Sequence, residues 1–297
     1  MSFVNQEYAP IPSASSDIPD CLISNHKPRP LPTPATETMY IPSNNATATA
    51  GGQLQFVIPV GTNHSYSDVN YEFDLNVVAT ADGDITGHVK FSGTTGSGSM
   101  LMEKAVSVYS GQTFDDTLDW GTCMDTNLTH GADKSFVTND CSIMMNSAQF
   151  LPESCRAQAG GANATPLQLS IPCLGFLAGS WSKSIPSYIM SGQITHTVNL
   201  ASAAKVFFAD GANFVITNYT ISNARISIKQ TTLEQSYCDD QRYLVNSGNV
   251  YNYEYQSYLN VQTSGTSINY TNGLNYESLD GVFVTCRLTA KTGLTNH

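Results

Sequence analysis

Few residues in this sequence have the types and spacing that acid–base or metal chemistry needs. The six histidines are far apart along the chain, and no two have the short separation that is typical of metal ligands. Two of them fall within strand-like stretches, where a hydrogen-bonded structural histidine is the more common role. The six are His26, His64, His88, His130, His196 and His297.

The carboxylates offer three local candidates, and each has a simpler structural explanation. Asp82 and Asp84 flank a glycine, which is typical of a tight turn and falls far short of the six to eight oxygens of a calcium site. The pairs Asp115-Asp116 and Asp239-Asp240 lie near predicted helix ends, where the helix dipole or solvent accommodates them. A glycosidase pair is recognised by distance in space, so the sequence leaves that alternative open.

The short motifs of common active sites are missing. The sequence has no G-x-S-x-G, no H-E-x-x-H, no G-x-x-x-x-G-K and no C-x-x-C, and no G-x-G-x-x-G follows a predicted strand. Seven cysteines are an odd number without close pairs, which favours reduced thiols in a protein made in the cytosol. We therefore predict no catalytic residue, no metal ligand and no cofactor, and we interpret the chain as not an enzyme.

The charge balance bears on partners. The formal net charge is −11, and only 13 Lys and Arg are spread over 297 residues, so direct binding to nucleic acid is not expected. Tyr251, Tyr253 and Tyr255 alternate and could form a platform for stacking sugars or bases. An ordinary β face with paired aromatic residues is the alternative that we favour.

The elements that would position these residues are mostly strands. Charged residues make up 12% of the chain, about half the usual share, and the many Tyr, Phe, Thr and Ser residues suit strands better than helices. Tyr71, Phe73, Leu75 and Val77 alternate with polar residues, as in a half-buried strand. Further strands are predicted at 54–59, 85–91, 105–109, 167–174, 193–200, 206–209, 214–222, 226–228, 251–255 and 282–287.

Helices are predicted only as short insertions. Residues 115–124 and 141–150 have weak helical character, with Thr113 and Asn139 as candidate caps, and residues 232–245 could form another short helix. The pattern as a whole predicts an all-β, antiparallel jelly-roll sandwich with long loops and short helical insertions.

The chain divides at about residue 42. Residues 1–42 hold eight of the 13 prolines and are predicted to form an extended N-terminal arm, whereas 43–297 form the jelly-roll domain. The arm carries only Lys27 and Arg29, and the first residues lack the pattern of a signal peptide. No stretch reaches the length of an apolar membrane span.

Three blocks of sequence carry more information than composition does. The first is LQLSIPCLGFLAGSWSKSIPSYIM at 167–190, with the strand QITHTVNL after it. The second is FVITNYTISNARISIKQ at 214–230, and the third is LNYESLDGVFVTCR at 274–287. In this order and spacing they resemble the major capsid proteins of the double-jelly-roll lineage, which includes adenovirus-like, polinton-like, virophage and large DNA viruses.

The resemblance rests on particular positions. Pro172 to Gly175 and Lys183 to Pro186 occupy the family's two turn elements, Tyr219 to Ala224 match a strand, and Ser278 to Arg287 match a later hydrophobic run. Upstream, residues 102–122 resemble a strand, a turn and a first loop helix, with Trp120 where the family has a tyrosine. These blocks resemble the first of the family's two barrels.

The resemblance implies a structural role in the virion. It implies a homotrimer that forms pseudo-hexagonal capsomers of an icosahedral shell, made in the host cytoplasm. Neighbouring capsomers are implied partners, and penton or minor capsid proteins could be bound through the N-terminal arm. A carbohydrate-binding or host-attachment jelly roll is the alternative, and a hydrolase with acids brought together by folding is a third.

Overall fold

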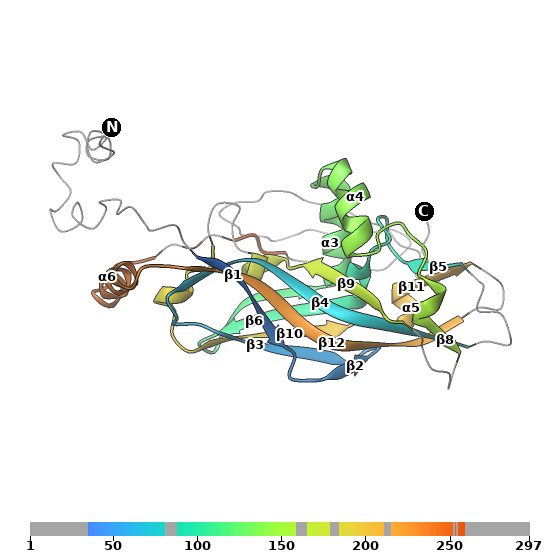
Figure 1. The fold of residues 1–297 in the computed structure, drawn as a ribbon, viewed down its shortest axis with the longest axis horizontal. Coiled ribbons are helices and arrows are strands. Elements are labelled where there is room, and N and C mark those ends of the chain that lie inside the picture. Colours follow the sequence, from blue (N-terminus) through green and yellow to red (C-terminus); the bar gives the residue numbers. More distant parts are fainter. Residues whose placement is uncertain are drawn as a thin grey trace, which may run out of the picture.

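The computed structural model describes residues 35–80, 88–158, 165–178, 184–210, 215–251, 253 and 255–258. Eight strands build its main body. In chain order they are β1 (Thr36–Pro42), β3 (Gln53–Pro59), β4 (His64–Thr80), β6 (Met102–Tyr109), β7 (Gln112–Leu118), β9 (Leu167–Pro172), β10 (Gln193–Leu200) and β12 (Val215–Thr232). They form two antiparallel sheets whose elements are arranged as Figure 1 shows.

The strand order defines the topology. In sheet A the order is β1-β12-β4-β9, and in sheet B it is β3-β10-β6-β7. Numbered one to eight along the chain, the strands run 1-8-3-6 in one sheet and 2-7-4-5 in the other. This is the arrangement of two interleaved Greek keys, so the predicted antiparallel jelly roll is confirmed.

Smaller elements complete the described chain. Sheet A also contains β2 (Thr47–Thr49) on β12 and β8 (Arg156–Gln158) parallel to β4, and β5 (His88–Phe91) pairs with β11 (Phe207–Asp210). The helices are α3 (Trp120–His130), α4 (Lys134–Met144), α5 (Ala203–Val206) and α6 (Gln235–Asn246). Figure 1 shows α3 and α4 projecting from one long side of the sandwich and α6 at one end.

The core lies between the two sheets. Along β10 the residues from Ile194 to Leu200 alternate strictly between buried and half-buried, and β4 alternates in the same way from Tyr71 to Val77. Each strand therefore turns one set of side chains inward, as the period of two requires. Trp120 from α3 is completely buried and meets Tyr71 edge to face, with ring centroids 5.8 Å apart.

The structure corrects the position of the first domain boundary. Thr36–Pro42, which the sequence places in the N-terminal arm, forms β1 and pairs with β12 from Thr36–Thr231 to Pro42–Arg225. The prolines dominate the residues before this segment, but TETMYI itself has the β-branched and aromatic residues of a strand. Residues 1–34 lie outside the described part of the chain.

The predicted helices between 113 and 150 are displaced. Residues 112–118 form strand β7, so α3 begins only at Trp120, and α4 begins at Lys134 after the N-cap Asp133, not Asn139. Pairing with β6 overrides the weak helical character of Asp115 and its neighbours. The helix predicted over 232–245 is confirmed as α6.

Three other strand predictions have different outcomes. The two strands predicted at 214–222 and 226–228 are one long strand, β12. Tyr251, Tyr253 and Tyr255 lie outside every strand, so that prediction is wrong. The Asp82–Asp84 turn and the strand at 282–287 lie outside the described residues. Among the helices that the structure describes, none has the length and apolar character to cross a membrane.

Candidate functional site

A buried polar contact in the interior of the sandwich joins its two sheets. Tyr71 of β4 places its hydroxyl 2.5 Å from Nε2 of His196 in β10, and Ser107 of β6 places Oγ 2.9 Å from Nδ1. All three are buried, and the His196 ring stacks on Phe56 and Tyr71. Burial lowers the pKa of His196 to about 3, because a charged ring would lose its hydration. His196 is thus a neutral structural residue, as its strand position predicts.

The carboxylate pairs do not converge. On β7, Asp115 faces the interior and Asp116 faces outward, where it pairs with Lys104 at 2.8 Å. Asp239 lies at α6 and pairs with Arg242 at 3.1 Å. Within the described residues, no group of three or more His, Cys, Asp or Glu side chains could hold a metal ion.

Asp115 has a structural task that the sequence did not reveal. It accepts hydrogen bonds from Thr117 Oγ1 at 2.9 Å and from the Phe176 backbone N–H at 3.4 Å. Burial raises its pKa, although these hydrogen bonds oppose the shift. The carboxylate thereby ties β7 to η4 (Gly175–Ala178), the short 3-10 helix after β9.

Gly175 is where this contact is tightest. Its φ is +73°, and a Cβ atom built there would lie 1.7 Å from Asp115 Oδ2. Only glycine can occupy such a position, since any side chain would overlap the carboxylate. The Pro172–Gly175 element of the first sequence block is therefore a turn that closes the flank of the jelly roll. Its partner element, Ile185–Pro186, bridges to Tyr66 at the start of β4.

The second sequence block also lies at a structural junction. Tyr219 is buried and donates its hydroxyl to the Ala201 carbonyl at 2.6 Å. Asn223 has a φ of +52° at a bulge in β12 and donates to Asp74 Oδ2 at 2.7 Å. Asparagine tolerates this left-handed conformation better than most residues do. The third block, 274–287, and Lys183 lie outside the described residues.

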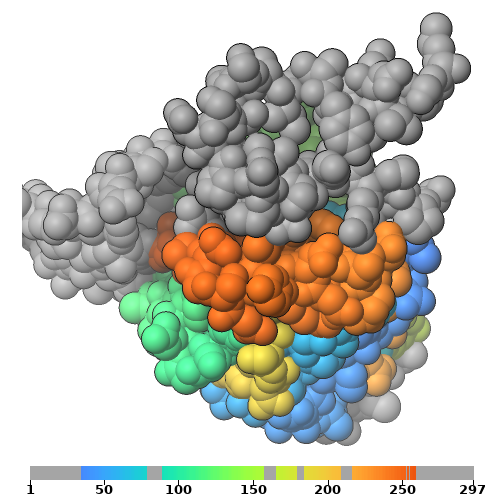
Figure 2. All heavy atoms as spheres, turned by 90° about the vertical axis from the view of Figure 1, so that its left-hand side faces the viewer, coloured from blue at the N-terminus to red at the C-terminus, as the bar shows by residue number. Residues whose placement is uncertain are grey.

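The tyrosines near the end of the described chain do not form a free platform. The Tyr253 and Tyr255 rings both meet Phe176 edge to face, and the Tyr255 hydroxyl donates to the Phe114 carbonyl. Their rings cover the same flank that Gly175 and Asp115 close. Upstream, Arg242 attaches α6 to the end of the sandwich through the carbonyls of Tyr188 and Gly61. Figure 2 shows α6, in orange, lying across that end.

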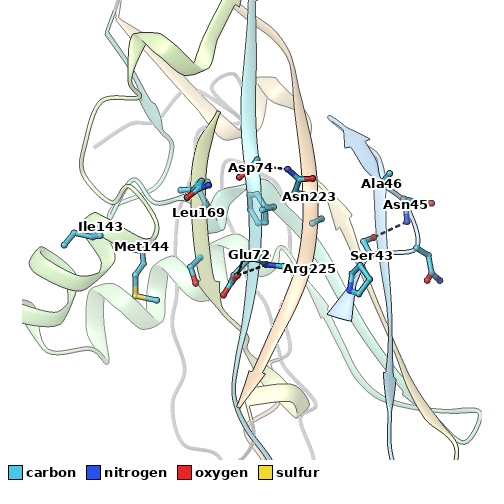
Figure 3. A pocket seen from close by; sticks show the side chains of 16 residues that line it. Ser43, Asn45, Ala46, Glu72, Asp74, Ile143, Met144, Leu169, Asn223 and Arg225 are labelled. Atoms are coloured by element: carbon cyan, nitrogen blue, oxygen red, sulfur yellow. Dashed lines mark hydrogen bonds and ion pairs between the residues drawn. The ribbon is translucent and has the colours of Figure 1, made fainter. Parts of the chain in front are cut away.

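The outer face of sheet A is polar and hollowed. A groove of about 800 Å³ crosses β9, β4 and β12 between α4 and the loop Ser43–Ala46. Figure 3 shows Ile143 and Met144 on the α4 side, and Ile143 is 80% exposed. The floor carries an ion pair between Arg225 and Glu72 at 2.8 Å. Each charged side chain of this groove thus has a neighbour within it, since Glu72 pairs with Arg225 and Asp74 accepts a hydrogen bond from Asn223.

The outer face of sheet B differs in composition. Its outward positions include Val57, Val106, Val108, Thr195 and Thr197, which are half-buried by their neighbours within the sheet. The charges in its middle rows are Lys104 and Asp116, which form one neutral pair. The central rows of this face therefore carry short, mostly β-branched side chains.

The five cysteines in the described part of the chain are free thiols: Cys123, Cys141, Cys155, Cys173 and Cys238. Burial raises the pKa of Cys123 to about 12 and that of Cys141 and Cys155 to about 11. Thiols with raised pKa values are poor nucleophiles at neutral pH. Cys21 and Cys286 lie outside the described residues.

Comparison with known proteins gives structural likeness alone. No family model and no curated protein matches the chain. The solved structures similar to it include a quasi-atomic model of the PBCV-1 virus capsid, at 14% identity over 72% of this chain, with a TM-score of 0.49. They also include the Faustovirus major capsid protein, at 13% identity over 71% and a TM-score of 0.48, and the mavirus major capsid protein, at 10% over 72% and 0.38.

Each of these three solved structures is of a virus capsid or of a major capsid protein. The chain covers 46% of the PBCV-1 chain, 56% of the Faustovirus chain and 48% of the mavirus chain. It thus spans about half the length of the solved chains that it matches. Its described residues make one jelly roll.

Proposed function

We propose that this protein is a structural subunit of an icosahedral virus shell and that it has no enzymatic activity. The observation that carries the proposal is the placement of the two described sequence blocks. The first supplies the Gly175 turn that packs on Asp115, and the second supplies the Asn223 bulge in β12. Gly175 and Asn223, two of the positions on which the family resemblance depends, thus lie at structural junctions of this jelly roll.

The interior supports a structural role as well. Aromatic and aliphatic side chains, together with His196, occupy the space between the sheets. A jelly roll with a filled interior is rigid and has no internal cavity for a substrate. Its function then depends on the contacts that its surface makes. The acidic chain carries no run of basic residues, so it is proposed to enclose the genome without gripping it.

The proposed assembly follows the resembled family. Residues 43–297, with β1 now added, would supply the first of two upright barrels, and three copies would form a pseudo-hexagonal capsomer. Residues 1–34 would contact an adjacent subunit, a penton protein or a minor capsid protein. The protein would be made in the host cytoplasm and would reside in the virion.

Imaging and sedimentation of the purified full chain test this proposal. We expect concentration-dependent association, with threefold rings or closed shells in electron micrographs. Dissociation should follow when the protein is diluted below the micromolar range. A chain that stays monomeric at high concentration and binds particular glycans would overturn the proposal in favour of the attachment module.

A further inference from the structure

The outer face of sheet B has the composition of a contact surface. Three registered rows cross it: Val57–Thr195–Val108, Gln55–Thr197–Val106 and Gln53–Asn199–Lys104. No described helix packs extensively on β10, the strand that runs through these rows. The face is therefore open along its central strand, within the described part of the chain.

Charge decides which partner this face suits. The chain has a net charge of −11, so two copies repel each other wherever acidic surfaces meet. On sheet A, the rows across β4 and β12 carry Asp68, Glu72 and Asp74 against Arg225 and Lys229. On sheet B, the two rows that contain Thr195 and Thr197 have no charge on β3, β10 or β6. On β7 the Thr197 row reaches Asp116, and Lys104 neutralises that carboxylate at 2.8 Å. A basic partner would gain nothing there, whereas a second copy could approach without opposing like charges.

Side-chain stiffness favours the same face. Valine and threonine branch at Cβ and hold few χ1 rotamers, so they lose little conformational freedom when a partner covers them. Lysine and glutamate at the same positions would each cost more to immobilise. The outward valines and threonines of sheet B can thus pack closely against another sheet at a low entropic cost. They are Val57, Val106, Val108, Thr195 and Thr197.

We propose that the outer face of sheet B binds the same face of a second copy of this chain, with Thr197 near the centre of the contact. This inference rests on the proposed function and names the surface through which neighbouring capsomers touch. Two sheets that pack face to face lie about 10 Å apart, a spacing that short branched side chains can fill. Because the same patch serves both copies, the contact is self-complementary.

The size of the face sets the strength of the contact. Four strands of about seven residues cover roughly 20 by 23 Å, or about 450 Å² on each copy. A standard stable interface uses about 800 Å² on each partner, so one such contact is weak by itself. A shell repeats it many times, and simultaneous engagement then makes the assembly stable. Weak, reversible pairing in solution is the expected behaviour.

Charge complementation at Thr197 tests the inference in the full chain. We expect Thr197→Glu and Thr197→Lys each to weaken self-association roughly tenfold or more, measured by sedimentation equilibrium. An equimolar mixture of the two variants should recover most of the wild-type association, because Glu and Lys then face each other. The matched controls are Asn70→Glu and Asn70→Lys, which place the same charges at an outward position of β4 in sheet A and should change association by less than about twofold.

Each other result has a definite meaning. Circular dichroism and thermal melting establish that the variants are folded before association is compared. If wild type and both Thr197 variants associate equally, the inference is overturned while the shell proposal stands. If each variant associates weakly and their mixture does not recover association, the face binds a different surface and the self-complementary contact is wrong. If the wild-type chain shows no association at all, both proposals fall.

Discussion

The space between the sheets and the outer surfaces of the sandwich use polar residues in opposite ways. Inside, the buried polar side chains of His196 and Asp115 have particular partners: His196 has Tyr71 and Ser107, and Asp115 has Thr117 and Phe176. Outside, polar and charged side chains form ladders on sheet A and give way to Val and Thr on sheet B. The interior contacts therefore fix one arrangement of strands, whereas the composition of the outer surface can differ between sheet A and sheet B.

The largest expected effect is at the flank, where interior and exterior meet. Gly175→Ala would place a Cβ atom 1.7 Å from Asp115 Oδ2 at a φ of +73°. We expect a loss of roughly 5 kcal/mol or more in the free energy of unfolding, because either the turn or the carboxylate must move. Chemical denaturation measures the loss. Gly192→Ala is the control, since its φ is +92° and no atom lies within 4 Å of the added Cβ, so only about 1 kcal/mol of strain is expected. Equal losses in the two variants would contradict the proposed clash.

Acid should destabilise the protein through His196. The folded pKa is lowered to about 3 from an ordinary value of 6.5, so the unfolded chain binds a proton between these values and the folded chain does not. Stability is therefore fully present above pH 6.5 and falls as the pH drops toward 3, by on the order of 4 kcal/mol for this group. Denaturation of wild type and His196→Gln across this range gives the measurement. An unchanged pH profile in the variant would show that His196 does not carry the effect.

A smaller loss is expected where a single interior hydrogen bond is removed. Tyr219→Phe deletes the hydroxyl that donates to the Ala201 carbonyl oxygen at 2.6 Å. The carbonyl then lacks this donor. The expected cost is about 1 to 2 kcal/mol, by thermal or chemical unfolding. Tyr40→Phe removes the same atom from a ring that is half exposed on β1 and should cost less than about 0.5 kcal/mol. Equal losses in the free energy of unfolding for Tyr219→Phe and Tyr40→Phe would contradict this difference between interior and exterior.

The smallest effect belongs to the exterior ion pair. Arg225→Gln breaks the 2.8 Å contact with Glu72 and the stacking over Tyr40, both on the solvent side of sheet A. We expect a loss of at most about 1 kcal/mol that shrinks as salt is added, because exposed charges are well screened. Unfolding at low and high ionic strength measures it. A salt-independent loss of several kcal/mol would mean that this face is more tightly organised than its exposure indicates.

The sequence predicts the strands better than it predicts their partners. Alternation at Tyr71–Val77 and Gln193–Leu200 identifies β4 and β10, because one face of each must be buried. It cannot reveal that β12 lies between β1 and β4, since such pairings depend on long-range register. The Tyr251–Tyr255 alternation is real, but it reflects rings of two tyrosines packing on Phe176 and not a strand.

The Gly175–Asp115 contact and the outer face of sheet B could not be predicted from the sequence, because both depend on which strands pair. The Gly175 motif is visible in the sequence, whereas its partner Asp115 is 60 residues earlier, in a segment whose pattern predicts a helix end. The alternating Val of β6 and Thr of β10 is a weak sequence signal for the neutral face of sheet B. These residues form one surface only because the two strands pair. The absence of active-site motifs, in contrast, is fully legible in the sequence.

The pairing of β1 with β12 also has a mechanical consequence. Thr36 lies opposite Thr231, so the chain enters and leaves the jelly roll at the same end of two neighbouring antiparallel strands. A force that pulls these two points apart acts across the ladder and opens its hydrogen bonds one after another. A force applied at opposite ends of the two strands, for example at Thr36 and Arg225, must instead shear many bonds together. Tension applied at Thr36 and Thr231 would therefore peel β1 from β12, starting at that end.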